Sequence, residues 1–229
     1  MTYQKATCTD CKVSFTFEPI MMGNKILFAP TKCDPCTDKA LTNYNEEVYI
    51  NAKKGSRKRF EQMIPPIYLD TLPERLSRLL TQHSEMWEYN PMGIGFIGQS
   101  GKGKTRASVL LLERMHDDGK TTFYISATDL ALNSANQFAD NPTTKDIARS
   151  ILTMCRTAQV LVIDDLGKGR MTDRAESELY DLLEYRTSRK VPTIWTSNSD
   201  AEGLHRMFSH DRATAIIRRL KEFSTIVRV

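Results

Sequence analysis

The sequence lacks any long apolar segment. No run approaches the roughly 20 apolar residues that a membrane-crossing helix requires. The first ten residues, MTYQKATCTD, also lack the apolar stretch of a signal peptide. We therefore expect a cytoplasmic protein with no membrane partner. Internal repeats and low-complexity tracts are absent too, which excludes a repeat architecture.

Cysteine is scarce, with five residues in 229. In a cytoplasmic protein such cysteines indicate metal ligands rather than disulfides. The formal net charge is only +4, and the excess lies within residues 1–60, which hold 10 Lys or Arg against 6 Asp or Glu. The remaining residues hold 22 of each. The hydrophobic content of 40% is enough for a core, and the length suits one ordinary domain with a small appendage.

Four of the cysteines form two pairs, each with two residues between its members: Cys8 with Cys11, and Cys33 with Cys36. The 21 residues between the pairs are one more than is usual for a four-cysteine zinc site. Alternating apolar residues predict a strand over 12–18, and 25–28 is its expected antiparallel partner. That hairpin would bring the pairs together as in a zinc ribbon. Four unconnected thiols are the alternative.

The expected zinc is structural, because four thiolates leave no open position for catalysis. So small a module cannot bury enough surface to fold alone. The metal would supply its folding energy, about 10–16 kcal/mol in comparable peptides.

A basic run follows this module. Five positive charges stand within seven residues: Lys53, Lys54, Arg57, Lys58 and Arg59. The run has two interpretations, which the sequence leaves open. It could attract a phosphate backbone, or it could be a solvated linker. We divide the chain into a zinc-binding module (1–50), a basic linker (51–60) and a nucleotide-binding domain (61–229).

Residues 98–105, GQSGKGKT, match the phosphate-loop pattern G-x-x-x-x-G-K-[ST] at every fixed position. An apolar strand is expected before the loop (92–97) and a helix after it (106–115), and the amino terminus of a helix attracts anions. Lys104 would reach the outer phosphates of ATP, and the Thr105 hydroxyl would bind Mg²⁺. The predicted ATP-binding residues are Gly98, Gln99, Ser100, Gly101, Lys102, Gly103, Lys104, Thr105 and Arg106.

A second apolar strand, 160–163, ends in Asp164 and Asp165. This is the Walker B pattern, which delivers an acid to the carboxyl end of a parallel sheet, where ligands bind. Asp164 would hold Mg²⁺, and Asp165 would orient or activate the attacking water. Asn198 ends the next expected strand, where it could contact the γ-phosphate or the water. The alternative is that Asn198 is an ordinary turn residue.

The remaining pattern alternates strands and helices, which predicts an α/β fold with a parallel sheet. Helices are expected at 71–88, 128–138, 144–157 and 172–189, and strands at 121–126, 192–197 and 224–229. Cys155 lies among apolar residues of an expected helix and is assigned to the core. His205 and His210 have no spacing that suggests a metal site.

Taken in order, these pieces resemble the DnaC/IstB-type AAA+ ATPases, most of all bacterial or phage helicase loaders. The resemblance covers residues 60–229 and rests on the segments IPPIY, GQSGKGKT, FYISATDL, VLVIDDLG, IWTSN and DRATAIIRRL. It implies a P-loop AAA+ (ASCE) parallel sheet flanked by helices. The chain stops soon after the arginine-rich segment, so we expect no helical lid. The implied roles are Walker A for Lys104 and Thr105, Walker B for Asp164 and Asp165, and sensor 1 for Asn198.

The arginine finger of the family falls within DRATAIIRRL, where Arg212 and Arg218 are the candidates and Arg219 is next. One departure concerns Asp165, which stands where many AAA+ proteins have glutamate. The shorter side chain could slow hydrolysis.

The resemblance implies a helicase loader for the initiation of DNA replication. Such a protein uses ATP to deliver a hexameric, DnaB-like replicative helicase onto single-stranded DNA. It would associate with itself through ATPase interfaces, in a bacterial or phage-infected cell. The first alternative is an IstB-like transposition helper that binds duplex DNA and regulates a transposase. A third hypothesis, a zinc-ribbon adaptor without enzymatic activity, is disfavoured by the intact Lys104, Thr105 and Asp164.

Overall fold

The computed structural model describes residues 3–22, 25–169 and 171–229. The chain divides into two compact units, Met1–Lys58 and Arg59–Val229. Each unit is considered by itself.

The first unit contains two antiparallel hairpins. Strand β1 (Gln4–Thr7) pairs with β2 (Ser14–Phe17), and β3 (Ile20–Met22) pairs with β4 (Lys25–Phe28). The expected pairing of the second and fourth strands is therefore wrong. The turn explains the difference: the Cys8 N–H donates to the Val13 carbonyl, and Lys12 adopts a left-handed backbone with φ 63°. This tight turn folds β2 back onto the strand that precedes it.

Helix α1 (Asp34–Met63) follows the hairpins. Residues 51–60, expected as a linker, lie within this helix. The sequence has no proline between Pro35 and Pro65, so nothing interrupts the backbone ladder. Pro35 occupies the first turn, where a missing N–H costs no hydrogen bond. The Lys, Arg, Glu and Gln residues of α1 are good helix formers, although the helix shows no clear apolar face.

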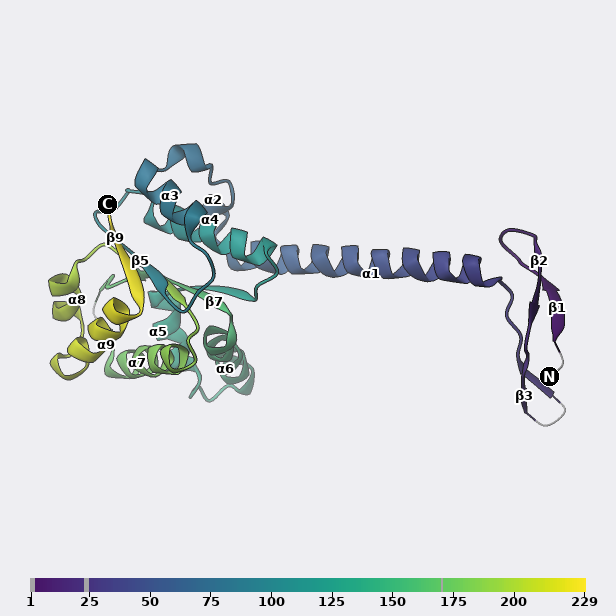
Figure 1. Ribbon diagram of the computed structural model, residues 1–229. Coiled ribbons are helices and arrows are strands. Elements are labelled where there is room, and N and C mark those ends of the chain that lie inside the picture. Colours follow the sequence, from purple (N-terminus) through teal and green to yellow (C-terminus); the bar gives the residue numbers. More distant parts are fainter. Residues whose placement is uncertain (1–2, 23–24, 170) are drawn as a thin grey trace. The chain divides into compact units, whose positions relative to one another are not determined.

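A five-stranded parallel sheet forms the centre of the second unit, in the order β6-β7-β8-β5-β9 (Figure 1). The strands are β5 (Gly93–Ile97), β6 (Thr122–Ser126), β7 (Val160–Leu166), β8 (Thr193–Ser197) and β9 (Ser224–Arg228). Each expected strand of this domain is present. The parallel sheet flanked by helices confirms the expected fold class.

Helices cover both faces of the sheet. One face carries α2 (Pro66–Leu69), α3 (Arg78–Met86) and α4 (Lys104–Asp117), and Phe60 of α1 is buried there. The other face carries α5 (Ala127–Asn136), α6 (Pro142–Thr157), α7 (Asp173–Ser188), α8 (Ala201–Met207) and α9 (His210–Glu222). Cys155 is buried in this second layer, as expected, and burial raises its thiol pKa to about 12.

The single helix expected over 71–88 is wrong. Pro73–Arg75 forms a 3₁₀ turn, and α3 begins only at Arg78, where the Ser77 hydroxyl accepts a hydrogen bond from the Leu80 N–H. A serine cap of this kind starts a helix more effectively than the upstream Thr71.

One buried arginine forms hydrogen bonds with backbone carbonyls near the ends of two helices and with the sheet. Arg186 of α7 is fully buried, and its guanidinium donates to the carbonyls of Cys155, Ala158 and Pro192 and to the Thr193 hydroxyl. Burial lowers its pKa to about 10. Across the part of the chain that the structure describes, no helix is both long enough and apolar enough to span a membrane.

Candidate nucleotide and metal sites

The phosphate loop connects β5 to α4, as its sequence requires. Gly98 has φ 154°, and a side chain there would overlap the carbonyl oxygen of Val229. Gly103 has φ 88° and lies against Leu76. Both positions therefore require glycine, and α4 starts directly after them with Lys104. The first N–H groups of a helix have no partner within it, so this helix end provides an anion site.

Lys104 is the lysine that the phosphate-loop pattern fixes. Its side chain is buried, and Nζ donates to the Gly98 carbonyl at 2.9 Å, the Gln99 carbonyl at 2.7 Å and Asn198 Oδ1 at 2.8 Å. Burial lowers the pKa of Lys104, while Asp165 and Asp164 act in the opposite direction. Asn198 reaches Lys104 because β8 lies next to β5 in the sheet.

Three hydroxyl groups surround the carboxylate of Asp164, which is 3% exposed. Thr105 Oγ1 donates to Oδ1 at 2.9 Å, Thr196 Oγ1 donates to Oδ1 at 2.6 Å, and the Tyr124 hydroxyl donates to Oδ2 at 2.8 Å. Burial raises the pKa of Tyr124, and the charge of Asp164 raises it further. The phosphate loop and the Walker B strand thus meet directly, with hard oxygen donors of the kind that Mg²⁺ prefers.

Asp165 has an unusual backbone, with φ 58°. Its N–H donates to Thr196 Oγ1 at 2.9 Å, and Lys168 Nζ lies 3.4 Å from its Oδ2. The side chain is half-buried and faces the cavity beside the phosphate loop.

That cavity has a volume of about 550 Å³. It is lined by Tyr68, Arg75, Leu76, Ser100, Gly101, Lys102, Gly103, Lys104, Thr105, Arg106, Asp165, Lys168 and Asn198. Most of the residues expected at the nucleotide site are in this set, and Gly98 and Gln99 are joined to it through Lys104.

Residues 72–229 match a family model described as IstB-like ATP binding protein. The chain belongs to this family. This match confirms the DnaC/IstB-type resemblance that the sequence motifs predicted.

Among curated relatives of this IstB-like chain, the replicative helicase loader DnaI of Bacillus subtilis is 23% identical over 145 residues, which cover 61% of this chain and 45% of DnaI. The phage-like element PBSX protein XkdC of Bacillus subtilis is 28% identical over 140 residues, which cover 59% and 50% of the two chains. The chain thus spans about half the length of the curated relatives it matches.

Solved structures show the same fold. A crystal structure of DnaI covers 72% of this IstB-like chain and 94% of its own, with a TM-score of 0.59 and 18% identity. A crystal structure of the DnaC helicase loader covers 75% and 99%, with a TM-score of 0.56 and 19% identity.

Sequence reasoning assigned Arg106 to the nucleotide cavity of this IstB-like domain but missed three other residues that line it, Tyr68, Arg75 and Lys168. Arg106 donates to the Thr71 hydroxyl at 3.0 Å and lies 5.6 Å from the ring centroid of Tyr68. Tyr68 belongs to the segment IPPIY, one of the segments on which the resemblance to DnaC/IstB-type proteins rests. The sequence assigned no role to this tyrosine. Arg75 and Lys168 line the cavity without any motif that would have identified them.

The candidate arginine fingers lie on α9, and none of them lines the described nucleotide cavity. Arg212 donates to the Asp173 carbonyl at 3.4 Å. Arg218 is exposed, with Nε 3.9 Å from a Glu222 oxygen. Arg219 forms an ion pair with Glu184, whose carboxylate raises the arginine pKa. Since Arg219 already has a close partner, Arg212 and Arg218 remain the candidates.

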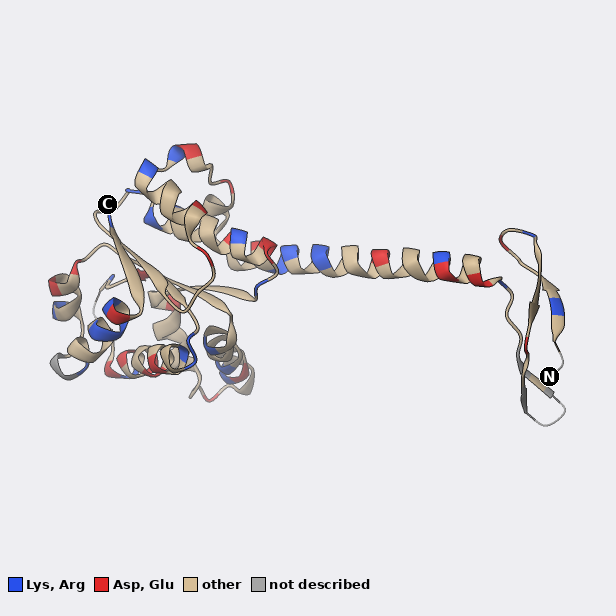
Figure 2. Ribbon diagram, in the orientation of Figure 1, with Lys and Arg blue, Asp and Glu red and all other residues tan. Residues whose placement is uncertain are grey.

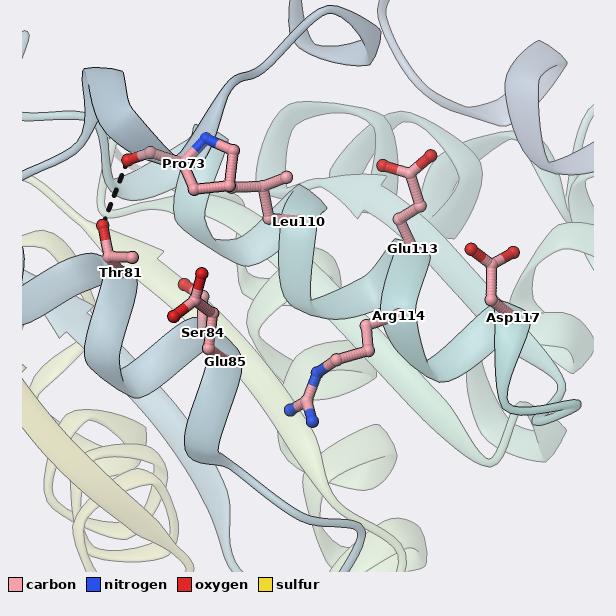
Figure 3. Close-up of a pocket in the computed structure, with 8 residues that line it drawn as sticks. All are labelled: Pro73, Thr81, Ser84, Glu85, Leu110, Glu113, Arg114 and Asp117. Atoms are coloured by element: carbon pink, nitrogen blue, oxygen red, sulfur yellow. Dashed lines mark hydrogen bonds between the residues drawn. The ribbon is translucent and has the colours of Figure 1, made fainter.

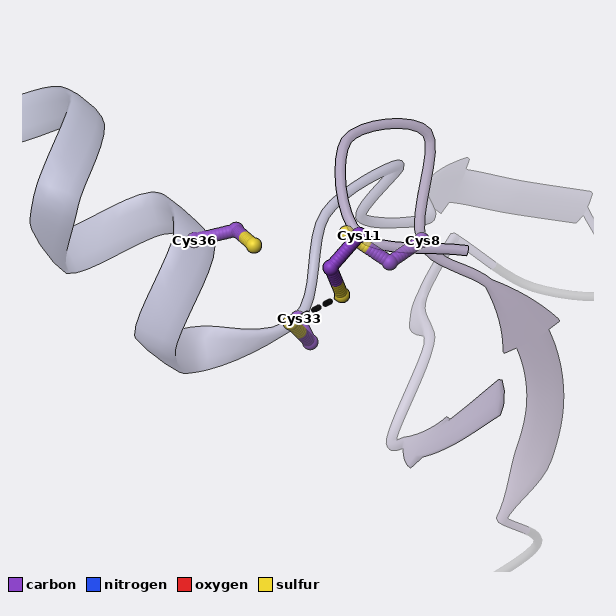
Figure 4. A group of neighbouring side chains, drawn as sticks. All are labelled: Cys8, Cys11, Cys33 and Cys36. Carbon is purple, nitrogen blue, oxygen red and sulfur yellow. Dashed lines mark hydrogen bonds between the residues drawn. The ribbon is translucent and has the colours of Figure 1, made fainter. Parts of the chain in front are cut away.

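The four amino-terminal cysteines lie outside the family match but form one cluster, with all four Sγ atoms within 4.8 Å of one another (Figure 4). Cys8 and Cys11 stand in the turn between β1 and β2, and Cys36 lies in the first turn of α1. Sγ of Cys11 is 3.6 Å from Sγ of Cys33. Backbone hydrogen bonds from Cys11 and Cys33 lower the pKa of Cys8 to about 6. Four clustered thiols of this kind fit a tetrahedral zinc ion.

A separate pocket of about 270 Å³ lies between α3 and α4 (Figure 3). Its lining includes Glu85, Glu113 and Asp117, together with Arg114, which donates to the Trp87 carbonyl. It shares no residue with the nucleotide cavity, and nothing assigns it a ligand.

The basic run lies on α1 (Figure 2). Lys53, Lys54 and Lys58 are exposed. Positions 53, 54, 57 and 58 lie on one side of a helix, because neighbours in space are three or four residues apart.

Proposed function

We propose that this IstB-like ATPase is a helicase loader, which uses ATP to deliver a DnaB-like replicative helicase onto single-stranded DNA in the bacterial cytoplasm. The observation that carries the proposal is the hydrogen-bonded group that joins Lys104 to Asn198 and Thr105 to Asp164. This group gives one chain the parts of an ATP site. The helicase as partner is supported by the relative DnaI, a replicative helicase loader.

We propose the following roles in ATP hydrolysis. Lys104 binds the outer phosphates, and Thr105 and Asp164 hold Mg²⁺, which would neutralise phosphate charge when bound. Asp165 orients the attacking water and accepts its proton. Water attacks the γ-phosphate as the bond to the β-phosphate oxygen breaks, and ADP leaves. Asn198 contacts the γ-phosphate side of the site, since it is already bonded to Lys104.

A third component is an arginine from a neighbouring subunit. Two observations support Arg212 and Arg218: neither is among the residues that line their own nucleotide cavity, and both lie on α9. An arginine supplied in trans typically accelerates hydrolysis by about 10³–10⁵, because it neutralises charge that develops in the transition state. Activity should therefore be slow in dilute protein and rise with protein concentration or added single-stranded DNA.

Mixing experiments test the arginine directly. Lys104→Ala subunits keep their arginines, and Arg212→Ala or Arg218→Ala subunits keep their phosphate loops. Mixtures of the two kinds should recover turnover that neither kind shows alone. If no mixture recovers activity and dilute wild-type protein hydrolyses ATP at full rate, the arginine does not act in trans.

The cysteine cluster is proposed to hold one zinc ion, which stabilises the first unit. The basic side of α1, defined by Lys53, Lys54, Arg57 and Lys58, is proposed to contact the DNA backbone. Its support is charge complementarity to phosphate. Binding through these residues should weaken steeply as salt is raised.

The helicase assignment is tested by retention of a DnaB-like helicase on the immobilised full chain, with ATP, with ADP and without nucleotide. Retention should respond to ATP in the wild type but not in Lys104→Ala, which is the matched control. The same preparations should bind single-stranded DNA better than duplex DNA. Absence of helicase retention, together with preference for duplex DNA, would instead favour a transposition helper.

A further inference from the structure

Thr196 lies opposite an interruption in the central sheet. The pairing of β7 with β8 runs from Leu161↔Thr193 to Ile163↔Trp195 and resumes only at Leu166↔Ser197. Asp164 and Asp165 of one strand therefore stand against Thr196 of the other. Two residues facing one define a β-bulge, a device that redirects side chains beside active sites.

The bulge changes where the two acids point. In a regular strand successive side chains face opposite sides of the sheet. Here Asp164 accepts from Thr105 of the phosphate loop, while Asp165 lines the cavity that this loop borders. Both consecutive carboxylates thus serve one site. The cost is the left-handed backbone of Asp165 at φ 58°, which non-glycine residues adopt only when their surroundings hold them there.

The hydroxyl of Thr196 holds both residues. Its oxygen accepts from the Asp165 N–H at 2.9 Å, and its hydrogen is donated to Asp164 Oδ1 at 2.6 Å. A backbone N–H can only donate, so the direction of both bonds is fixed. Thr196 is fully buried, and a deeply buried group depends on protein partners for its hydrogen bonds.

We infer that Thr196 is a positioning residue for ATP hydrolysis, whose hydroxyl sets the bulge that directs Asp164 and Asp165 to the same nucleotide. The inference rests on the proposed roles of these two acids. Thr196 does not touch the nucleotide cavity and acts through them. The next residue of β8 supports the same junction, since Ser197 Oγ donates to the Leu166 carbonyl at 2.7 Å.

Three variants test the inference in the full chain. Thr196→Val keeps the shape and removes the hydroxyl, and Thr196→Ser keeps the hydroxyl. Thr193→Val is the matched control, because Thr193 is buried on the same strand and its hydroxyl bonds Arg186 rather than an acid. Turnover, the affinity for a non-hydrolysed ATP analogue and the urea midpoint are measured for each. All assays use high protein concentration and saturating single-stranded DNA.

We expect kcat of Thr196→Val to fall about 10–100-fold, the usual effect of losing a partner that orients an active-site ligand, while affinity for the analogue changes little. Thr196→Ser should restore kcat, and Thr193→Val should lose stability but keep kcat. If Thr196→Val fails to fold, the turnover of Thr196→Ser is compared with that of Thr196→Ala instead. Equal turnover in the hydroxyl-bearing and hydroxyl-free variants would overturn the inference. None of these measurements involves the helicase. If the chain retained no helicase, the loader proposal would fail, while the turnover of the Thr196 variants would still test this inference.

Discussion

Removal of zinc should unfold the amino-terminal module and leave the nucleotide site intact. The module has almost no core of its own. Among the first-unit residues whose side chains the structure describes, Cys8 alone is buried. The only aromatic contact described there joins Phe15 and Phe17, with ring centroids 6.0 Å apart. Such a pair contributes about 0.5–1.5 kcal/mol.

A structural zinc ion contributes far more, about 10–16 kcal/mol in comparable peptides. Its loss therefore exceeds what the described apolar contacts can replace. A zinc ion would also hold the two cysteine turns, in which the Cys8 N–H donates to the Val13 carbonyl and the Thr37 N–H donates to the Cys33 carbonyl. In contrast, the second unit contains both apolar cores and the whole nucleotide cavity.

Hydrogen exchange measured by mass spectrometry provides the assay. A zinc chelator should remove amide protection from residues 4–33, and Cys8→Ser should have the same effect. Cys155→Ser is the control, because Cys155 lies in the other unit. This substitution should leave the zinc content at about one ion per chain. Binding of a fluorescent ATP analogue should continue after chelation. Unchanged exchange over residues 4–33, or ATP binding that requires zinc, would refute this reasoning.

Three further predictions concern the ATPase unit. Lys104→Ala should abolish tight ATP binding, whereas Asp165→Ala should retain binding and lose turnover; equal loss of binding in titrations of both would make Asp165 a metal ligand or a structural residue. Gly101→Ala should destabilise the chain by ~1–3 kcal/mol through backbone strain alone. Gly98→Ala should destabilise it by more, because the added methyl group at position 98 would also overlap a backbone carbonyl. The urea midpoints of the two variants test this difference. Arg186→Met should cost at least ~3 kcal/mol in the same assay, because several buried carbonyls lose their donor, and a neutral result would contradict that.

The nucleotide site was the most predictable part of the protein. The phosphate loop is a local motif with glycine and lysine at fixed positions, so its strand and helix could be placed from sequence. The run 160–165 identified its own strand in the same way. Asn198 was placed by strand periodicity, and its contact with Lys104 follows from the adjacency of β5 and β8.

Residues brought together only by tertiary structure were missed. Tyr124 and Thr196 hydrogen-bond to Asp164 across 40 and 32 positions of sequence, and a tyrosine or threonine in a strand carries no signal of that contact. Residues 51–60 of helix α1 were expected as a linker for a different reason. Its residues have helical propensity without an apolar periodicity, and periodicity was the basis of the other helix assignments.

The order of strands in the sheet also determines when the nucleotide site can form during synthesis. β5, which leads into the phosphate loop, has β8 and β9 as its neighbours, and both are made about 100 residues or more later. Contacts between residues so far apart in sequence form slowly, because the chain loses the entropy of closing a long loop before the contacts stabilise it. A ribosome-bound chain that has emerged only as far as α7 therefore has a phosphate loop without its sheet. Nucleotide binding would report that about the last quarter of the domain, which contains β8 and β9, has been made and folded.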